Sequence, residues 1–341
     1  MKASYKARQR RTTALLAILG LGGCLGTPSA HGPSEASPPS VYAAGSYDDG
    51  QKRIPCYWVE TGRTDLPGDG SHDAQANCVF VPDRGAVYSA GYYSDGKKHI
   101  PCRWRGTART DLPGSAGGEA VSLFVSSGGW PYAAGFYLGN GGTKQIPCYW
   151  AGTTRFDLPG GSAGSALAIT ATGAKVYTAG YYQDRTRLIP CYWVGTTRTD
   201  LPFSAQSGQA TSIYLSGGVV YTAGADGGTP CYWTGTAETV LPGRGFATSI
   251  LVAGGKVFAA GESTAGGACY WVGTTETDLS RDIPPGSSVV YSILVSGDTV
   301  HASGARDEGS IEVPCSWADS LRTDFPDTAK GAKINSTFLK Q

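Results

Sequence analysis

The stretch IPCYWVGTTRTDLP, residues 189–202, has a close copy in IPCYWAGTTRFDLP, residues 146–159. Looser copies recur along the chain, each with a cysteine two residues before a tryptophan. The intervals between these cysteines run from 38 residues (Cys231 to Cys269) to 46 (Cys56 to Cys102). The seven pairs are Cys56/Trp58, Cys102/Trp104, Cys148/Trp150, Cys191/Trp193, Cys231/Trp233, Cys269/Trp271 and Cys315/Trp317. An internal repeat of this length is the first guide to the fold.

Each repeat contains four short segments with β-strand composition. In chain order they resemble ATSIYLS (210–216), VYTAGYY (176–182), IPCYW (189–193) and TRTDLP (197–202). Glycine turns or Asp-Gly hairpins such as Asp95-Gly96 separate them. Repeats of about 40–50 residues with four strands each are typical of a β-propeller. With Gly and Pro together at 70 of 341 residues, long helices are not expected.

The two ends of the repeat array complement each other. The array begins at Val41 with a second-type strand and ends with INSTFLK (334–340), which has the pattern of a first-type strand. A solenoid would instead need capping repeats at its ends. We therefore predict an all-β fold, a seven-bladed β-propeller of four-stranded antiparallel blades over 41–341. The C-terminal strand would complete the first blade and leave no free sheet edge.

The repeat resembles that of uncharacterised bacterial lipoproteins with tandem VYxAGYY…CYW…TDLP units. The resemblance covers about residues 41–341 and implies no defined activity. It agrees with the N-terminus, where five basic residues precede the apolar segment Thr12–Gly23 and the sequence LGGC. This order predicts a lipoprotein signal peptide over 1–23 and lipidation of Cys24, an ordinary signal peptide with a chance cysteine being the alternative. Residues 24–40 would form a disordered tether rich in Pro, Ser, Gly and Ala.

The predicted localisation is the cell envelope, with the membrane as partner through the N-terminal lipid. Leu25 after the lipidated cysteine favours the outer membrane if the host is Gram-negative. Removal of the predicted leader would remove five of the 28 Lys and Arg residues and no acidic residue. The remaining chain would have 23 basic residues and 27 acidic ones. The resulting charge of −4 argues against a nucleic-acid partner.

Seven repeated cysteines could indicate a metal site, disulfides, reactive thiols or packing. Equivalent positions on neighbouring blades lie at least about 10 Å apart, too far for disulfides or for one shared zinc ion. We therefore expect small buried thiols beside packed tryptophans, Cys78 included, and no metal or cofactor. The repeated aspartates, such as Asp157 and Asp200, are expected to bond to nearby backbone within their own blades.

Alternating strands place the turns between first and second strands, and between third and fourth strands, on one face, here called the turn face. The second-to-third hairpins and the links between repeats share the opposite face, here called the loop face. The loop face varies more in sequence and is the expected location of a site. Tyr47, Tyr93, Tyr137 and Tyr182 lie near it in the first four repeats, with basic residues in the same hairpins. They are candidate ligand-binding residues for stacking on a sugar or peptide, the alternative being that they stiffen the hairpins.

These observations predict a monomeric binding or scaffolding module for a glycan, peptide or envelope protein. The alternative is an extracytoplasmic glycan hydrolase or lyase that uses loop carboxylates. The sequence contains no nucleophile elbow or phosphate-binding loop, and we assign no catalytic residue.

Overall fold

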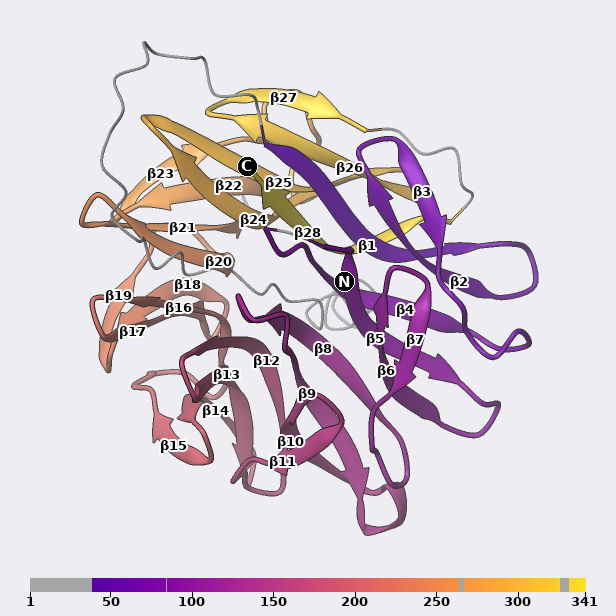
Figure 1. The fold of residues 1–341 in the computed structure, drawn as a ribbon. Helices are drawn as coiled ribbons and strands as arrows, with labels where there is room; N and C mark the ends of the chain where they lie inside the picture. Colours follow the sequence, from indigo (N-terminus) through magenta and orange to yellow (C-terminus); the bar gives the residue numbers. More distant parts are fainter. Residues whose placement is uncertain (1–38, 84, 264–266, 326–330) are drawn as a thin grey trace.

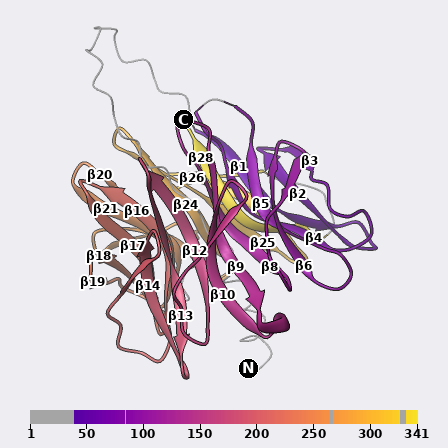
Figure 2. The ribbon, with the colours of Figure 1, turned by 60° about the horizontal axis from the view of Figure 1, so that its bottom comes forward.

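The structure is a computed structural model that describes residues 39–83, 85–263, 267–325 and 331–341. In these residues, 28 strands form seven four-stranded antiparallel sheets arranged as blades around a central axis (Figure 1). The predicted all-β seven-bladed propeller is confirmed. Figure 2 shows the blades from a second direction. One short 3₁₀ helix, η1 (Asn140–Gly142), lies in a hairpin of the third blade.

Each blade runs outward from an innermost first strand to an outermost fourth strand (Figure 1). The first strands are β28 (Lys333–Lys340), β4 (Ala74–Phe80), β8 (Gly118–Val125), β12 (Ala163–Thr172), β16 (Gly208–Ser216), β20 (Gly245–Ala253) and β24 (Ser288–Ser296). The second strands are β1 (Ser40–Asp48), β5 (Tyr88–Ser94), β9 (Pro131–Gly139), β13 (Lys175–Asp184), β17 (Val219–Asp226), β21 (Lys256–Ser263) and β25 (Thr299–Glu308).

The outer half of each blade follows the same order. The third strands are β2 (Arg53–Val59), β6 (His99–Arg105), β10 (Lys144–Ala151), β14 (Arg187–Val194), β18 (Thr229–Thr234), β22 (Gly267–Val272) and β26 (Ile311–Ala318). The fourth strands are β3 (Gly62–Asp65), β7 (Ala108–Asp111), β11 (Thr154–Asp157), β15 (Thr197–Asp200), β19 (Ala237–Val240), β23 (Thr275–Asp278) and β27 (Leu321–Asp324). Blades are numbered 1 to 7 from β1, so β28 belongs to blade 1.

The ring is closed by the two ends of the repeat array. Strand β28 pairs antiparallel with β1, with Ser40 opposite Lys340 and Ala43 opposite Thr337. Strand β28 also contacts blade 7 on one side and blade 2 on the other. The buried carboxylate of Glu312 in blade 7 accepts hydrogen bonds from the backbone N–H of Ile334 (2.9 Å) and from Lys333 Nζ (3.2 Å). The predicted closure by the C-terminal strand is therefore confirmed.

The repeated Cys-x-Trp motif packs each blade against the preceding one. Trp271 of blade 6 shares a buried cluster with Tyr232 of blade 5, so the residue between Cys and Trp faces the next blade. Each of the seven tryptophans is at most 1% exposed. In most blades the indole N–H donates to a carbonyl in the link that precedes its blade. Examples are Trp150 to Pro113 (3.0 Å) and Trp193 to Pro159 (3.1 Å). The repeated Leu-Pro thus supplies an acceptor for the tryptophan of the following blade.

A β-bulge in every first strand explains the repeated glycine of the second strands. In blade 4 the register shifts between Ala166 and Ala168, opposite Gly180. A Cβ atom on Gly180 would overlap the carbonyl oxygen of Ser165, and the equivalent glycines meet equivalent carbonyls. The close approach that excludes a side chain therefore lies between two strands of one blade. A bulge places two residues opposite one and bends the strand locally.

The bulged residue itself links neighbouring blades around the axis. Asn335 Nδ2 donates to the Ala76 carbonyl of blade 2 (2.9 Å), and Asn77 Nδ2 donates to Ala120 of blade 3 (2.9 Å). Thr211, Thr248 and Tyr291 donate in the same way to the carbonyls of Ala247, Val290 and Ile334. In blades 3 and 4 the bulged residues are the apolar Val121 and Leu167.

Candidate functional site

The four candidate tyrosines form a repeated side-chain cluster with an aspartate and an arginine of their own blade. Each tyrosine hydroxyl donates to the aspartate Oδ2, at 2.8 Å for Tyr137 to Asp157 and 3.0 Å for Tyr182 to Asp200. Tyr47 with Asp65 and Tyr93 with Asp111 repeat this hydrogen bond at 3.0 Å. The repeated aspartates therefore bond to side chains in these blades, and the expectation of backbone partners is wrong there. In blade 6, Asp278 does accept from the backbone N–H of Ser280.

The arginine of each cluster covers the ring and joins the blade to its neighbour. The Arg155 guanidinium lies 3.5 Å from the centre of the Tyr137 ring, and its Nε donates to Asp157 at 2.8 Å. Its Nη1 also donates to the Pro113 carbonyl in the link from blade 2. Arg63, Arg109 and Arg198 cover Tyr47, Tyr93 and Tyr182 at 3.8–4.0 Å. The arginine thus makes a cation–π contact with the tyrosine ring and an ion pair with the aspartate that accepts from the tyrosine hydroxyl.

These clusters place Tyr93, Tyr137 and Tyr182 in the packing between blades, with exposures of 7–9%, whereas Tyr47 is half-buried. Burial and the hydrogen bond to the aspartate raise the pKa of all four tyrosines, that of Tyr182 to about 12. The structure does not bring the four tyrosines together into one surface. A ligand would reach the ring faces only after the arginine side chains had moved.

Blades 5 and 6 carry an acid where the other blades carry the arginine. Glu238 and Glu276 occupy this position, and burial raises the pKa of both carboxyls. In blade 7, Arg306 takes the place of the tyrosine and its Nε donates to Asp324 Oδ2 at 3.0 Å. The loop face is therefore divided between four uniform blades and three divergent ones, as the sequence indicated.

Several basic residues of the hairpins on the loop face contact the adjacent links between blades. Lys98 Nζ donates to the Ser115 carbonyl at 3.1 Å, and Arg187 Nη2 donates to Ala205 at 3.3 Å. Lys52 makes the same contact to Gly70. The hairpin tips are fixed as well, since Asp95 Oδ1 accepts from the backbone N–H groups of Lys97 and Lys98. The loop face of blades 1, 2 and 4 is therefore held in place by contacts between hairpin and link.

The two histidines near these loops are paired with acids. His72 Nδ1 lies 2.5 Å from Asp69 Oδ2, and His99 Nδ1 lies 3.0 Å from Glu119 Oε1. His99 also stacks on Tyr92, with 4.0 Å between ring centres. The hydrogen bond to His72 lowers the pKa of Asp69. Asp69 is therefore paired within its own link, whereas Glu119 of β8 is paired with His99 of β6 in the neighbouring blade.

The repeated cysteines fit the expected packing role. The eight cysteines in the described part of the chain are buried thiols, Cys78 among them. Burial raises the pKa of the thiols of Cys102, Cys148, Cys191, Cys231, Cys269 and Cys315. Among the same residues, no group of three or more His, Cys, Asp or Glu side chains is arranged to hold a metal ion. Cys24 and the signal peptide over 1–23 lie outside the described residues.

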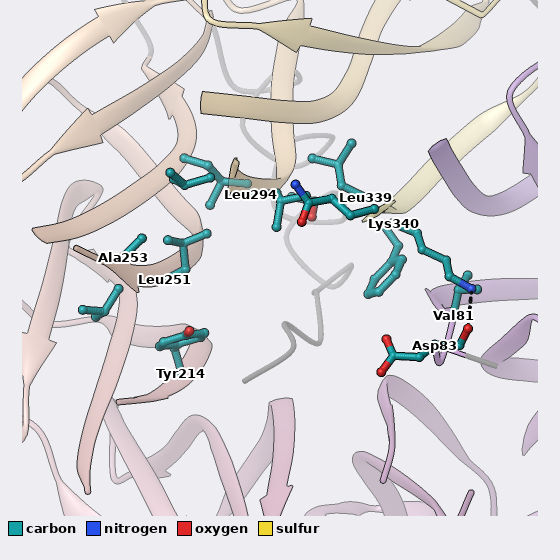
Figure 3. A pocket seen from close by; sticks show the side chains of 14 residues that line it. Val81, Asp83, Tyr214, Leu251, Ala253, Leu294, Leu339 and Lys340 are labelled. Carbon is teal, nitrogen blue, oxygen red and sulfur yellow. Dashed lines mark hydrogen bonds between the residues drawn. The ribbon is translucent and has the colours of Figure 1, made fainter. Parts of the chain in front are cut away.

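A cavity that the sequence did not indicate lies at the axis on the turn face. Its volume is about 180 Å³, and it is lined by the ends of the first strands of blades 1, 2, 5, 6 and 7. Figure 3 shows Tyr214, Leu251 and Ala253 on one side and Leu339 and Lys340 on the other. Lys340 Nζ donates to the Pro82 carbonyl at 2.9 Å. The apolar strand ends are visible in the sequence, but their convergence depends on ring closure.

No helix of the described residues is long and apolar enough to cross a membrane. No family model matches the chain, and no curated protein matches it either.

Solved structures that resemble the chain include a candidate 6-phosphogluconolactonase from Bacteroides fragilis NCTC 9343. It has 12% identity, a TM-score of 0.49, and coverage of 91% of this chain and 100% of that chain. TolB from Acinetobacter baumannii has 10% identity and a TM-score of 0.46, over 88% of this chain and 66% of that chain. The β-propeller domain of the Trilobed protease from Pyrococcus furiosus has 10% identity and a TM-score of 0.45, over 72% of this chain and 82% of that chain. Similarity at this level indicates neither activity nor ligand.

Proposed function

We propose that this chain is a lipid-anchored β-propeller of the cell envelope that acts as a binding or scaffolding module. Its partner would be a glycan, a peptide or an envelope protein that binds the loop face. The observation that carries the proposal is the fixed loop face of blades 1, 2 and 4, where Lys52, Lys98 and Arg187 hold the adjacent links. A surface held in one conformation loses little entropy on binding.

The repeated reactive groups support a binding role over catalysis. The thiols are buried with raised pKa values, and the aspartates of blades 1 to 4 are held by tyrosine and arginine. What differs between blades is the sequence of the exposed hairpins and links, and loops that differ on a constant scaffold are common sites of recognition. Tyr47, Tyr93, Tyr137 and Tyr182 would contribute by stiffening this surface, with Tyr47 the most accessible of the four.

The experiment is a binding screen of the full-length, detergent-purified protein on glycan and peptide arrays, with chemical cross-linking in cells for protein partners. The loop-face variant is Lys97→Glu with Arg185→Glu, and the matched control is Lys175→Glu with Lys256→Glu on the turn face. All four side chains are exposed. We expect binding to fall at least about tenfold in the loop-face variant alone, because reversal of an interfacial charge is costly.

Equal loss in both variants would contradict a site on the loop face. Release of cleaved glycan during the screen would favour the hydrolase or lyase alternative. The anchor is tested separately, by mass spectrometry of the N-terminal peptide and by the membrane content of a Cys24→Ala variant. A lipid-free N-terminus in the parent protein would contradict the anchoring part of the proposal.

A further inference from the structure

We propose that the turn face of the propeller rests on the membrane surface, so that the loop face points away from the bilayer. The inference rests on the proposed lipid anchor and adds an orientation to it. Its first support is the position at which the chain enters the propeller. Ser40 begins β1 opposite Lys340, and Lys340 and Gln341 line the cavity at the axis. The tether therefore leaves from the turn face, beside the axis.

The length of the tether keeps that face near the anchor. Ser40 follows Cys24 by sixteen positions. If this segment is the disordered tether that its composition predicts, its root-mean-square span would be about 20–24 Å and its full extension roughly 55 Å. At that average span the anchor would lie close to the turn face, while the loop face is farther from it by about 30 Å, the length of the nine-residue strand β1.

The second support is the distribution of exposed apolar side chains. Of the five large hydrophobic residues that are exposed in the described part of the chain, Trp130 (55%), Val219 and Leu321 lie at turns of this face, in blades 3, 5 and 7. The other two, Phe156 and Val240, lie in fourth strands. Single apolar side chains on separate blades are normal at protein surfaces. Of these three residues, Trp130 is the one whose residue type favours a membrane interface.

Trp130 is the eighth tryptophan and the one outside the Cys-x-Trp pairs. It belongs to an insertion in the first turn of blade 3, where the backbone N–H of Ser126 donates to the Trp130 carbonyl at 3.0 Å. Its indole lies over Gly152 in the other turn of the same blade, so the ring is held at the turn face. Tryptophan is enriched where lipid headgroups meet the hydrocarbon layer.

The centre of the same face is also apolar. Val81, Leu251, Leu294 and Leu339 surround the mouth of the axial cavity (Figure 3). Asp83, Lys340 and the C-terminal residue Gln341 also line the cavity, and Lys340 Nζ donates to the carbonyls of Pro82 and Asp83. The exposed basic residues at turns of this face, Lys175, Lys256 and Arg105, are offset by the exposed acids Glu60, Asp83, Asp298 and Asp319. We therefore expect contact with neutral and anionic bilayers alike, with little dependence on salt.

Trp130 provides the test, because the other seven tryptophans are buried. The lipidated full-length protein is reconstituted into phosphatidylcholine vesicles with and without brominated acyl chains, which quench nearby indoles. The Trp130 signal is the fluorescence of the parent minus that of Trp130→Phe. We expect brominated lipid to reduce this signal at least about twofold. A matched probe on the loop face, Lys97→Trp in the Trp130→Phe background, should keep its full intensity.

Flotation of the vesicles separates the outcomes. Quenching of the Lys97→Trp probe instead of Trp130, or of neither in protein that floats, would overturn the orientation while leaving the anchor in place. Protein that does not float would overturn the lipid anchor and the orientation together. Both variants change exposed positions, and their folding is to be checked by circular dichroism.

Discussion

At the scale of single residues, the tyrosine–aspartate–arginine cluster should make the free energy of unfolding fall at alkaline pH. Tyr182 donates to Asp200, and burial and this bond raise its pKa to about 12 from an ordinary 10. Because the folded-state pKa is raised, its contribution to stability is complete below about pH 10 and is lost as the pH rises through 12. The ionised ring would then face Asp200 as a second negative charge.

We therefore expect Tyr182→Phe to be less stable than the parent at pH 8, by about 1 kcal/mol, because one hydrogen bond is lost. This difference should shrink between pH 10 and 12. Urea unfolding of both proteins at pH 8 and 11.5 measures it. The other tyrosines titrate in both proteins and cancel in the comparison, so a difference that persists at pH 11.5 would contradict the assigned role.

The cysteines give a second prediction at this scale. All eight in the described residues are at most 1% exposed. Since thiolate is the reactive form and burial opposes its formation, iodoacetamide should leave them unmodified in the native protein. All eight should react after denaturation without a reducing agent. Peptide mass spectrometry checks both states, and a disulfide-linked peptide would contradict the packing role.

At the scale of the element, the bulge of the first strand determines which residue its partner strand can hold. Gly180→Ala would place a methyl group on the Ser165 carbonyl, so a strand must move. Overpacking of this kind typically costs about 1–3 kcal/mol. Gly62→Ala is the matched control, since its new Cβ atom would make ordinary contact with the Val59 carbonyl at 3.5 Å. Thermal unfolding should show a clear loss for Gly180→Ala and almost none for Gly62→Ala.

At the scale of the whole molecule, stability depends on closing the ring through β28. Removing residues 333–341 would expose the edge of β1 and the buried faces of blades 2 and 7. We expect the truncated chain to aggregate or to lose cooperative unfolding, because an unpaired inner strand is a template for association.

A circular permutant tests whether the stability of the closed ring depends on the contacts of β28 or on its position at the end of the chain. Joining Lys340 to Ser40 through Gly-Gly recreates the turn seen at Gly217-Gly218 and Gly254-Gly255. New ends in the link after Asp324 would leave β28 paired with β1. We expect this permutant to unfold cooperatively within a few degrees of the parent, as measured by calorimetry. Failure of the permutant to fold would mean that closure depends on chain order as well as on contacts.

The sequence by itself determined the repeat and the four strand types, because each depends on local alternation and on turn residues within one repeat. It also indicated the closure, because the array begins with a second-type strand and ends with the first-type strand that is missing from the first repeat. It also identified the thiols as packing groups, since Cys and Trp two residues apart must share a face. It did not reveal the partners of the tyrosines. Tyr137 lies in β9 and Arg155 and Asp157 lie in β11, and only the registers of these two strands with β10 bring the tyrosine to its partners.

Tertiary structure alone decided the features that require several blades at once. The bulge residues reach carbonyls of the next blade, as Asn335 reaches Ala76, which is 259 positions away in the chain. The apolar mouth at the axis exists because strand ends from five blades converge on one point. No single repeat encodes that convergence, because it follows from the angle at which whole sheets pack around a closed ring.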